Sequence, residues 1–506
     1  MSKTIGKATD LITFSRSSKG TALRKVAYGP ELVTNGTFDR GISGWTDTSS
    51  VGGAIAWDAS GYLDLIYTTA NARAEQTMPV EVGKTYIVSA EIITASGLNY
   101  GVYVGTPALS SAYGLFANAG GAGVRTFTFV ATSETLRLQA IKAGGGEFKL
   151  DNVSVKEVTF DQGDLTLFNH PADIPRIEYD ASGNVLGLLV EEARTNLVTY
   201  SEDFSGPGRG WAVQSDAVLT GNRVTSPAGD ENAYAITISA TNTSAVFASA
   251  ITGVGTYTVS AWLKVPSGTA DLRIGFYNVT DGLLTQAITV TDEWQRFSFT
   301  ATVSAASNAY PLLQKVTPNY IGDVYIYGAQ VEAGAFSTSY IPTNGATATR
   351  AADVASIATS EFGYRADEGT VVVECNYSSG SDVDPFNRAA LVMDDGTADN
   401  RILIYNRTSY ANSSFVAESG NTQAAINGLA ATDAFVKTAL AVSQDDFAAC
   451  SNGGSVGVDS AGLVPPITRC GIGCNVAGAT FLNGHIKSIK YYPRRLLNNQ
   501  LVEVTS

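Results

Sequence analysis

One block of β-type sequence occurs twice in this chain, and this duplication constrains the fold more than any other feature. In each block, an opening Leu-Val-Thr segment and a Gly-Trp pair are followed by a Tyr-x-Val-Ser-Ala segment, a Phe-x-Phe segment and a closing strand-like segment. The landmarks are Leu32–Phe38, Trp45, Gly83–Ala90, Arg125–Thr132 and Phe148–Val155 in the first block, and Leu197–Phe204, Trp211, Gly255–Ala261, Arg296–Thr302 and Val324–Val331 in the second. Landmarks in the same order at similar spacing indicate two copies of one structural module.

The composition is typical of short strands joined by tight turns. Only 16% of the 506 residues are charged, and 51 are Gly. A chain of this length suits roughly three domains. Polar and apolar side chains alternate along Thr85–Ala90, as a two-layered antiparallel sandwich requires. We therefore predict an all-β, multi-domain protein.

The charge and the apolar pattern exclude two classes of partner. A formal net charge of −14 disfavours a nucleic-acid surface, because phosphate binding depends on Lys and Arg. The sequence contains no apolar run long enough to span a bilayer and no signal-peptide core after Met1,. We expect a protein that is made in a cytoplasm without a signal peptide and does not insert into membranes.

The sequence divides into five parts. They are a basic arm (1–27), a first module (28–158), a connector (159–195), a second module (196–348) and a different third domain (349–506). The arm carries six Lys or Arg residues and one acid, Asp10, which fits either a solvated tail or an arm that orders on a partner. In the connector, apolar segments on both sides of Ala181–Asn184 predict a β-hairpin.

Each module resembles the jelly-roll carbohydrate-binding modules. The motifs that carry this resemblance are Asn35-x-x-Phe38, Gly44-Trp45, the Tyr-x-Val-Ser-Ala segment and the closing Asp-Asn-Val-Ser-Val at 151–155. The resemblance implies a jelly-roll β-sandwich for each module. Trp45 and Trp211 follow Gly at the same repeat position and are predicted to be core anchors.

The connector and the third domain resemble parts of tailed-bacteriophage structural proteins. The segment Gly187–Leu197 with Tyr200–Phe204 is similar to one that recurs in these proteins. The third domain resembles their concanavalin-A-like or laminin-G-like sandwich through Lys437–Ala441, Asp446–Ala449, Asn452–Gly454, Asn483–Lys487 and Tyr491–Leu496. Because Ile12–Ser18 resembles the strand that normally precedes the connector hairpin, the first module is predicted to be inserted into the connector.

The sequence disfavours catalysis. The chain has two histidines, His170 and His485, and neither has a Ser or Cys partner in its sequence context as a nucleophilic triad needs. The Glu-x-Asp-x-x-Glu pattern of concanavalin-like glucanases is absent from the sequence, and adjacent acids on a strand point to opposite faces. We predict that the chain is not an enzyme.

Sugar binding is the better-supported chemistry, because aromatic rings stack on the apolar faces of sugars. The candidate platforms are Trp57, Tyr62 and Tyr103 in the first module, and Trp262 and Tyr277 in the second. The module family also implies a structural Ca²⁺ at Asn35, Thr37 and Asp151. Asp151 fits equally well as an acceptor of hydrogen bonds from a turn. Tyr327 aligns with Asp151 in the second module, so no metal is expected there.

All four cysteines, Cys375, Cys450, Cys470 and Cys474, lie in the third domain. They fit buried thiols, or a disulfide that forms among Cys450, Cys470 and Cys474 after release from a reducing cytoplasm. A zinc site is weaker, because the Cys470-x-x-x-Cys474 pair has no second close pair. We predict at least one disulfide in mature particles.

These features together predict a non-enzymatic virion protein, such as a tail or collar fibre or a decoration subunit. Its modules would project from the particle and bind host-surface polysaccharide during host attachment. It would assemble as a homo-oligomer and dock on other virion proteins through the arm. The alternative is a purely architectural head, neck or tail subunit without a ligand, and a polysaccharide depolymerase ranks below both.

Overall fold

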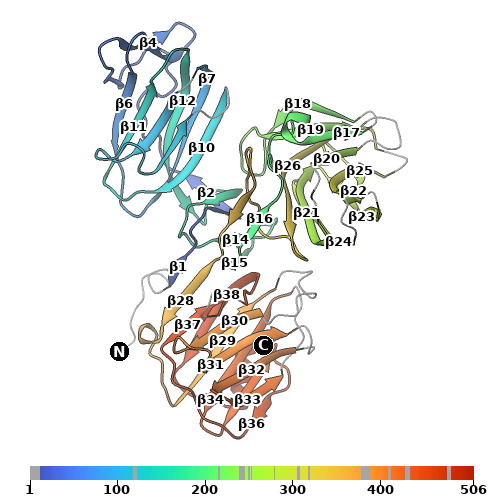
Figure 1. Cartoon of the computed structure of the whole chain (residues 1–506). Coiled ribbons are helices and arrows are strands. Elements are labelled where there is room, and N and C mark those ends of the chain that lie inside the picture. The colour runs from blue at the N-terminus through green and yellow to red at the C-terminus, as the bar shows by residue number, and fades with distance from the viewer. Residues whose placement is uncertain are drawn as a thin grey trace. The chain divides into compact units, whose positions relative to one another are not determined.

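The computed structural model confirms the all-β class. Its described residues are 12–97, 99–117, 122–214, 217–238, 245–248, 251, 253–278, 280–304, 308–316, 320–377, 388–407, 412–427, 434–475 and 480–506. Within them the chain forms β-strands, two short 3-10 turns (Pro207–Arg209 and Thr359–Glu361) and one helix, α1 (Asn498–Thr505) (Figure 1). That helix is too short to cross a membrane, and no other helix is present among these residues.

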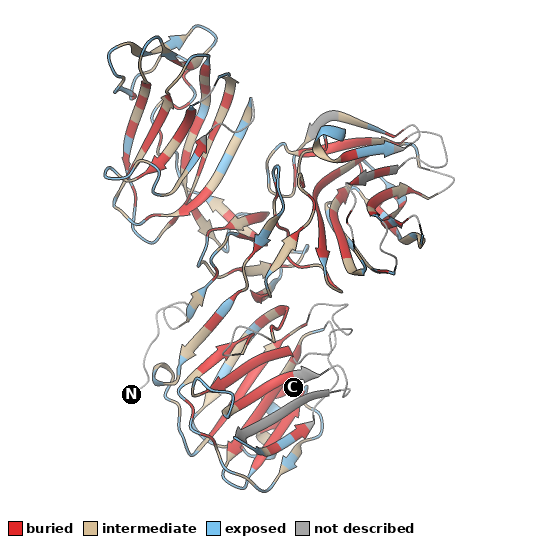
Figure 2. Cartoon of the chain, in the orientation of Figure 1, coloured by how far each residue is buried: buried red, intermediate tan, exposed pale blue. Residues whose placement is uncertain are grey.

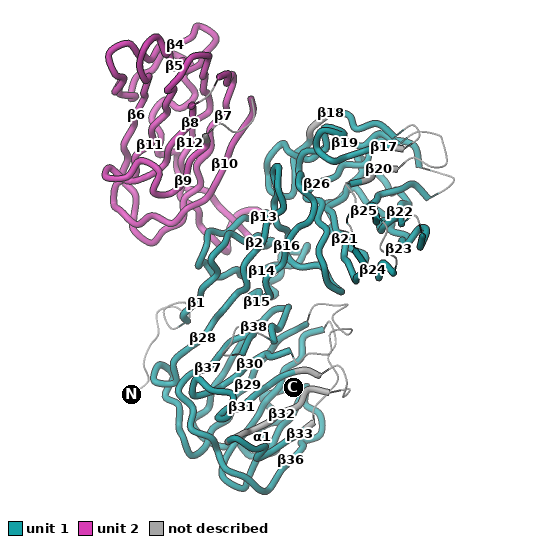
Figure 3. The backbone as a smooth tube through the Cα atoms, viewed as in Figure 1, with its two compact units in different colours: residues 1–24, 166–506 teal, residues 25–165 magenta. Residues whose placement is uncertain are grey.

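The chain forms two compact units (Figure 3). One unit is residues 25–165, and the other combines residues 1–24 with residues 166–506. The chain passes from one unit to the other within β2 (Gly20–Tyr28) and again within β13 (Asp164–His170). The first module is therefore inserted into the larger unit, as the resemblance of Ile12–Ser18 implied.

The first module contains two sheets that enclose one core. One sheet has the order β10 (Gly123–Val130), β7 (Thr85–Ala95), β12 (Phe148–Phe160), β5 (Tyr62–Tyr67) and β4 (Gly53–Asp58), and β12 also pairs with β2, which is followed by β13. The other has the order β3 (Thr46–Asp47), β6 (Ala72–Pro79), β11 (Thr135–Lys142), β8 (Tyr100–Gly105) and β9 (Gly114–Ala117).

The second module repeats this topology strand for strand. One sheet has the order β24 (Gln295–Val303), β21 (Gly255–Lys264), β26 (Gly322–Ala333), β19 (Ala233–Ile238) and β18 (Val218–Val224). The other has the order β17 (Trp211–Gln214), β20 (Ala245–Ala248), β25 (Ala309–Lys315), β22 (Thr269–Asn278) and β23 (Gly282–Thr291). Strands β3 to β12 thus correspond in order to β17 to β26, and the predicted duplication is confirmed.

Two seven-stranded sheets form the third domain. One has the order β1 (Thr13–Ser15), β28 (Val354–Ala358), β37 (Arg469–Ile472), β30 (Arg388–Asp394), β31 (Asn400–Arg407), β32 (Asn412–Ser419) and β33 (Thr422–Asn427). The other has the order β14 (Ile177–Tyr179), β15 (Val185–Val190), β38 (Gly484–Tyr492), β29 (Glu368–Cys375), β34 (Val436–Ser443), β35 (Phe447–Ser451) and β36 (Gly457–Asp459). A separate two-stranded pair joins β16 (Arg194–Asn196) to β27 (Ala348–Arg350).

Strands from the predicted arm and connector belong to the third domain. The predicted hairpin is present as β14 and β15, and Leu189 of β15 lies opposite His485 of β38. Phe14 of β1 lies opposite Ala355 of β28. The sequence predicted a separate arm over residues 1–27. For residues 12–27 this prediction is wrong, because β1 pairs with β28 and β2 pairs with β12. Residues 1–11 lie outside the described residues.

Alternation of inward and outward side chains builds the cores of both modules (Figure 2). Trp45 and Trp211 are 7% and 5% exposed, and each packs on a phenylalanine of its opening segment, Phe38 at 5.5 Å and Phe204 at 4.4 Å between ring centroids. Each indole N–H donates to a backbone carbonyl of that segment. The predicted role of both tryptophans as core anchors is confirmed.

Five charged side chains meet in a buried cluster of the larger unit, which we call the arginine cluster. Its members are Arg16, Arg176, Glu191, Arg350 and Asp353, all of them buried. Asp353 accepts from Arg16 Nη1 at 3.1 Å and from Arg176 Nη2 at 2.5 Å, and Glu191 accepts from Arg176 Nη2 at 2.9 Å. Burial lowers the pKa of Arg16 to about 10, with Arg176 adding to the shift and Asp353 opposing it.

We predict that Asp353→Ala destabilises the larger unit by about 3–5 kcal/mol, because it leaves buried guanidinium groups without their shared acceptor. The free energy of unfolding, followed by urea denaturation, measures this loss. Asp367→Ala is the matched control, since Asp367 pairs with Arg365 at an exposed position, where ion pairs contribute little. Unchanged stability of the Asp353 variant would contradict the role of the cluster.

Candidate functional site

The outer face of the β3-β6-β11-β8-β9 sheet in the first module gathers polar and apolar side chains. Along β11, Leu136, Leu138 and Ala140 are buried in the core. Because successive side chains of a strand point to opposite faces, Arg137 and Gln139 point to the outer face.

A row of four side chains crosses this face. Glu75 of β6 lies opposite Gln139 of β11, Gln139 lies opposite Tyr103 of β8, and Tyr103 lies opposite Leu115 of β9. Directly opposite residues share a face, with their Cβ atoms about 5 Å apart. We call this set the cross-strand row.

Glu75 forms the polar end of the cross-strand row. Its Oε1 accepts from Arg137 Nη2 at 2.8 Å, from Thr48 Oγ1 at 2.9 Å, and from the Gln139 amide. Burial on its own would raise the pKa of Glu75, but the hydrogen bonds from Arg137, Thr48 and Gln139 outweigh it and lower the pKa. The carboxylate therefore stays ionised and holds its donors in fixed orientations.

The other end of the cross-strand row is apolar. Tyr103 is partly buried, Leu115 is 40% exposed, and Leu109 in the preceding loop is 59% exposed. An aromatic ring beside oriented hydrogen-bonding groups can stack on the C–H face of a sugar while the polar groups bind its hydroxyls. This face has the chemistry of a glycan-binding site.

The corresponding sheet of the second module carries a different surface. Tyr277 of β22 lies opposite both Tyr310 of β25 and Leu283 of β23, and Tyr277 and Leu283 are 39% and 47% exposed. Arg273 lies opposite Gln314. The strip from Tyr310 to Leu283 is apolar and contains no carboxylate.

The five aromatic residues chosen from the sequence do not form one site. Tyr103 and Tyr277 lie on corresponding strands, β8 and β22, of the two modules. Trp57 and Tyr62 lie on β4 and β5 of the other sheet, where the Trp57 indole N–H donates to the Phe38 carbonyl at 2.7 Å. Trp262 lies on β21 with a buried indole nitrogen that has no hydrogen-bond partner.

Glu75, Arg137 and Gln139 were not identified from the sequence. The signal for two of them is the alternation in Leu136-Arg137-Leu138-Gln139, where polar residues interrupt a buried strand. Glu75 is recognised only through the register of β6 against β11.

Two of the three residues of the predicted calcium site have other partners. Asn35 Nδ2 donates to the Gly41 and Ser43 carbonyls at 2.9 and 3.1 Å, and Thr37 Oγ1 donates to Asp39 at 2.7 Å. Asp151 accepts from the Asn152 N–H at 2.7 Å, as the alternative interpretation of a turn acceptor requires.

Two other carboxylates, Glu91 and Asp39, act on Asp151. Burial raises the pKa of Asp151, with Glu91 and Asp39 adding to the shift. Among the described residues no group of three or more His, Cys, Asp or Glu side chains is placed to hold a metal ion. Calcium binding at Asn35, Thr37 and Asp151 remains a prediction.

The register of the sheets supports the alignment of Tyr327 with Asp151. Asp151 lies opposite Glu91, and Tyr327 lies opposite Trp262, each just before a bulge. The next residue has positive φ in both modules, 48° for Asn152 and 62° for Gly328. Aromatic rings thus replace carboxylates at this position of the second module.

All four cysteines are buried free thiols, so the predicted disulfide is not formed in this structure. Cys450 lies on β35 and Cys470 on β37, which belong to different sheets. Burial raises the pKa of Cys470 to about 12. Disulfide formation needs a thiolate, and this environment disfavours one.

The two histidines lie in different surroundings. His485 Nε2 contacts Glu178 Oε2 at 2.7 Å, and its Nδ1 contacts Asn376 Oδ1 at 3.0 Å, so it joins β38 to β14. Burial, with Arg24, Arg176 and Arg16 adding to it, lowers the pKa of His170. The contacts of His485 with Glu178 and Asn376 involve no Ser or Cys nucleophile.

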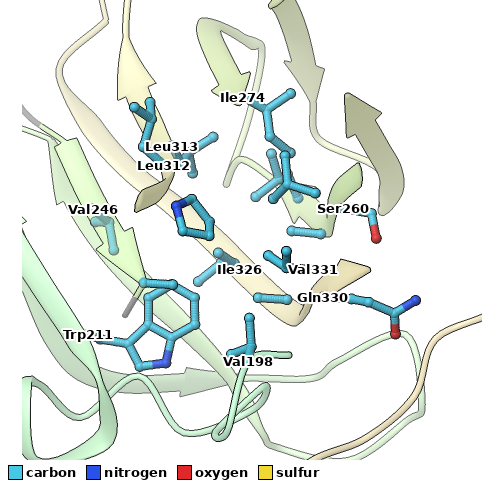
Figure 4. A pocket seen from close by; sticks show the side chains of 16 residues that line it. Val198, Trp211, Val246, Ser260, Ile274, Leu312, Leu313, Ile326, Gln330 and Val331 are labelled. Carbon is cyan, nitrogen blue, oxygen red and sulfur yellow. The ribbon is translucent and has the colours of Figure 1, made fainter. Parts of the chain in front are cut away.

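The interior of the second module contains a small cavity (Figure 4). It has a volume of about 30 Å³ and lies between the sheets, lined by apolar side chains that include Trp211, Val246, Leu313, Ala329 and Val331. The polar Gln330 at its rim is bonded to the Ile341 N–H. This cavity is a packing defect with room for about two water molecules at most, so it is not a ligand site.

No protein-family model and no curated protein matches the chain. Among solved structures, the tandem CBM22-1-CBM22-2 domain of Paenibacillus barcinonensis Xyn10C matches at 10% identity and a TM-score of 0.23, over 62% of this chain and 100% of that one. The tandem CBM51 modules of Sp3GH98 from Streptococcus pneumoniae match at 10% identity and 0.17, over 64% and 100%. A Trypanosoma rangeli sialidase matches at 8% and 0.25, over 98% and 94%. Scores this low carry no argument about function.

We predict that Ala329→Val stabilises the second module by about 1 kcal/mol, because its two added carbons fill part of the cavity. Ala329 corresponds to Val153, since each donates its N–H to the opening segment, to Ser201 and Gly36 respectively. The matched variant Val153→Ala should destabilise the first module by roughly 2 kcal/mol. Thermal denaturation measures both. A lower melting temperature for Ala329→Val would mean that the cavity cannot accept the methyl groups.

Proposed function

We propose that the chain is a non-enzymatic glycan-binding protein and that the cross-strand row of the first module is its binding face. The observation that carries this proposal is the alignment of Glu75, Gln139, Tyr103 and Leu115 on four adjacent strands. Hydrogen-bonding groups and an aromatic ring therefore share one face of the sheet, on which Gln139 is 4% exposed and Tyr103 is partly buried.

The dimensions of the row favour an oligosaccharide over a single sugar. Neighbouring strands lie about 4.8 Å apart, so three intervals span roughly 14 Å. The charge of Glu75 is balanced by Arg137 at 2.8 Å, which favours an uncharged glycan.

The state of Glu75 supports binding over hydrolysis. Glycosidases pair a carboxylate with a carboxylic acid whose pKa is raised. The pKa of Glu75 is lowered, and its Oε1 is already occupied by three donors. Such a group donates protons poorly, and its contribution to binding is to hold Arg137 and Gln139 in place.

The proposal extends to a place in a bacteriophage virion. It rests on the connector motif, whose segments Ile177–Tyr179 and Val185–Val190 form strands of the third domain. In this proposal the chain folds in the host cytoplasm, assembles with itself and with other virion proteins, and carries the glycan-binding face on the particle. An antibody against this chain should label intact particles, and particles without label would contradict this part of the proposal.

We predict that Tyr103→Ala and Gln139→Ala each weaken glycan binding about tenfold or more, which corresponds to about 1.4 kcal/mol. A glycan array identifies the ligand, and calorimetry on the full chain gives the dissociation constants. Tyr62→Ala is the matched control, because Tyr62 lies on β5 of the other sheet.

Equal weakening by the Tyr62 variant would place the ligand elsewhere. If no glycan binds, the architectural alternative holds instead.

A further inference from the structure

A carboxyl group of the second module lies beneath two tyrosines, outside the proposed glycan face. Glu202 Oε1 accepts from Tyr340 Oη at 2.8 Å and from Tyr327 Oη at 3.0 Å. Tyr327 and Tyr340 are 4% and 1% exposed. The Tyr340 hydroxyl also contacts Ser201 Oγ at 2.6 Å, so this network fixes the carboxyl in place.

The first module has a threonine where the second has Glu202. The Ser201 carbonyl accepts from the Ala329 N–H at 3.0 Å, as the Gly36 carbonyl accepts from the Val153 N–H at 2.9 Å. Thr37 and Glu202 are the residues that follow these two positions. In the second module an ionisable side chain, Glu202, therefore contacts two tyrosines, whereas the first module has Thr37 at this position.

Residues 225–232, which we call the cover segment, join β18 to β19 next to this network. Within the segment, Ser226 Oγ donates to Asp230 Oδ1 at 2.5 Å, and Asn232 Nδ2 donates to Asp230 Oδ2 at 2.8 Å. Groups outside the segment also bond to it. Trp294 Nε1 donates to the Thr225 carbonyl at 3.1 Å, and the Leu167 N–H donates to the Pro227 carbonyl at 2.9 Å. Ala228 of the segment packs against the apolar cluster that contains Tyr327 and Tyr340.

We propose that Glu202, Tyr327 and Tyr340 form a proton-operated latch, which holds the cover segment closed while the carboxyl is protonated and loosens it when the proton is lost. A protonated carboxyl can lie under the tyrosines without charge. An ionised one is a partly buried anion, and the charge of Asp230 disfavours it. Opening would uncover the apolar cluster formed by Leu167, Ala233, Tyr327 and Tyr340.

Among the residues that the structure describes, the groups that act on Glu202 include no cation. Asp230 faces it from the cover segment, Tyr327 from β26, and Tyr340 from the segment after β26. The neighbouring Asp203 is already paired with Arg209 at 2.9 Å. Arg296 interacts electrostatically with Tyr340, and its guanidinium donates to the Thr338 carbonyl and to Ser260 Oγ.

The titration of Glu202 gives the direction of the switch. Burial, with the Asp230 charge adding to it, raises the pKa of Glu202 to about 7, although the bonds from Tyr340 and Tyr327 oppose the shift. The closed form therefore binds the proton more tightly than the open form does. Closure is favoured fully below the ordinary glutamate pKa, near 4.3, and the advantage is lost as the pH rises to about 7.

Hydrogen exchange measured by mass spectrometry on the full chain tests the latch. After correction for intrinsic exchange, we expect protection of the cover segment to fall at least tenfold between pH 5 and pH 8. Glu202→Gln should keep protection high at both pH values, because the amide oxygen still accepts from the tyrosines without a charge. Asp230→Asn should reduce the pH dependence by removing the facing carboxylate.

Glu231→Gln is the matched control. It removes a charge from the same segment, but Glu231 is exposed and accepts from Thr225, so the wild-type pH dependence should persist. Equal protection of the wild-type segment at pH 5 and pH 8 would overturn the proposal. A Glu202→Gln variant that loses protection as the wild type does would overturn it as well.

Discussion

Buried charge that must be paired is the constraint on which the larger unit depends. Arg16 and Asp353 are 337 positions apart in sequence, yet they meet in the arginine cluster at 3.1 Å. Removing one member of a buried ion pair leaves an uncompensated charge. The opening strand, the connector hairpin and the segment before β28 must therefore come together at once. This requirement explains why segments on either side of two modules belong to one domain.

The sequence predicted what is local or repeated. The duplication, the alternation along Thr85–Ala90 and the hairpin around Ala181–Asn184 depend on residues close in the chain, and the structure contains all three. The resemblance of Ile12–Ser18 indicated the opening strand, but the buried partner of Arg16 was missed, because nothing near Arg16 indicates a carboxylate more than three hundred residues away. The sequence shows that Arg16 carries a positive charge, but only the fold shows that Asp353 is its partner.

The candidate site shows the same limit. Tyr103 could be selected by residue type, but its partners Gln139 and Glu75 lie on other strands, and only the register places them beside it. Asn35 and Thr37 were selected by motif, and the structure commits their side chains to the loop that holds them. A motif identifies a position reliably, but the hydrogen bonds available there depend on neighbours that the motif does not contain.

The insertion of the first module has a consequence for how such a chain can change. Val26 of β2 lies opposite Phe160 of β12, so the chain enters and leaves the module through two adjacent antiparallel strands. Segments whose ends lie close together are tolerated as insertions in a host domain. The module can therefore be exchanged as a unit, and recombination could replace it with another sandwich while the host sheets stay intact.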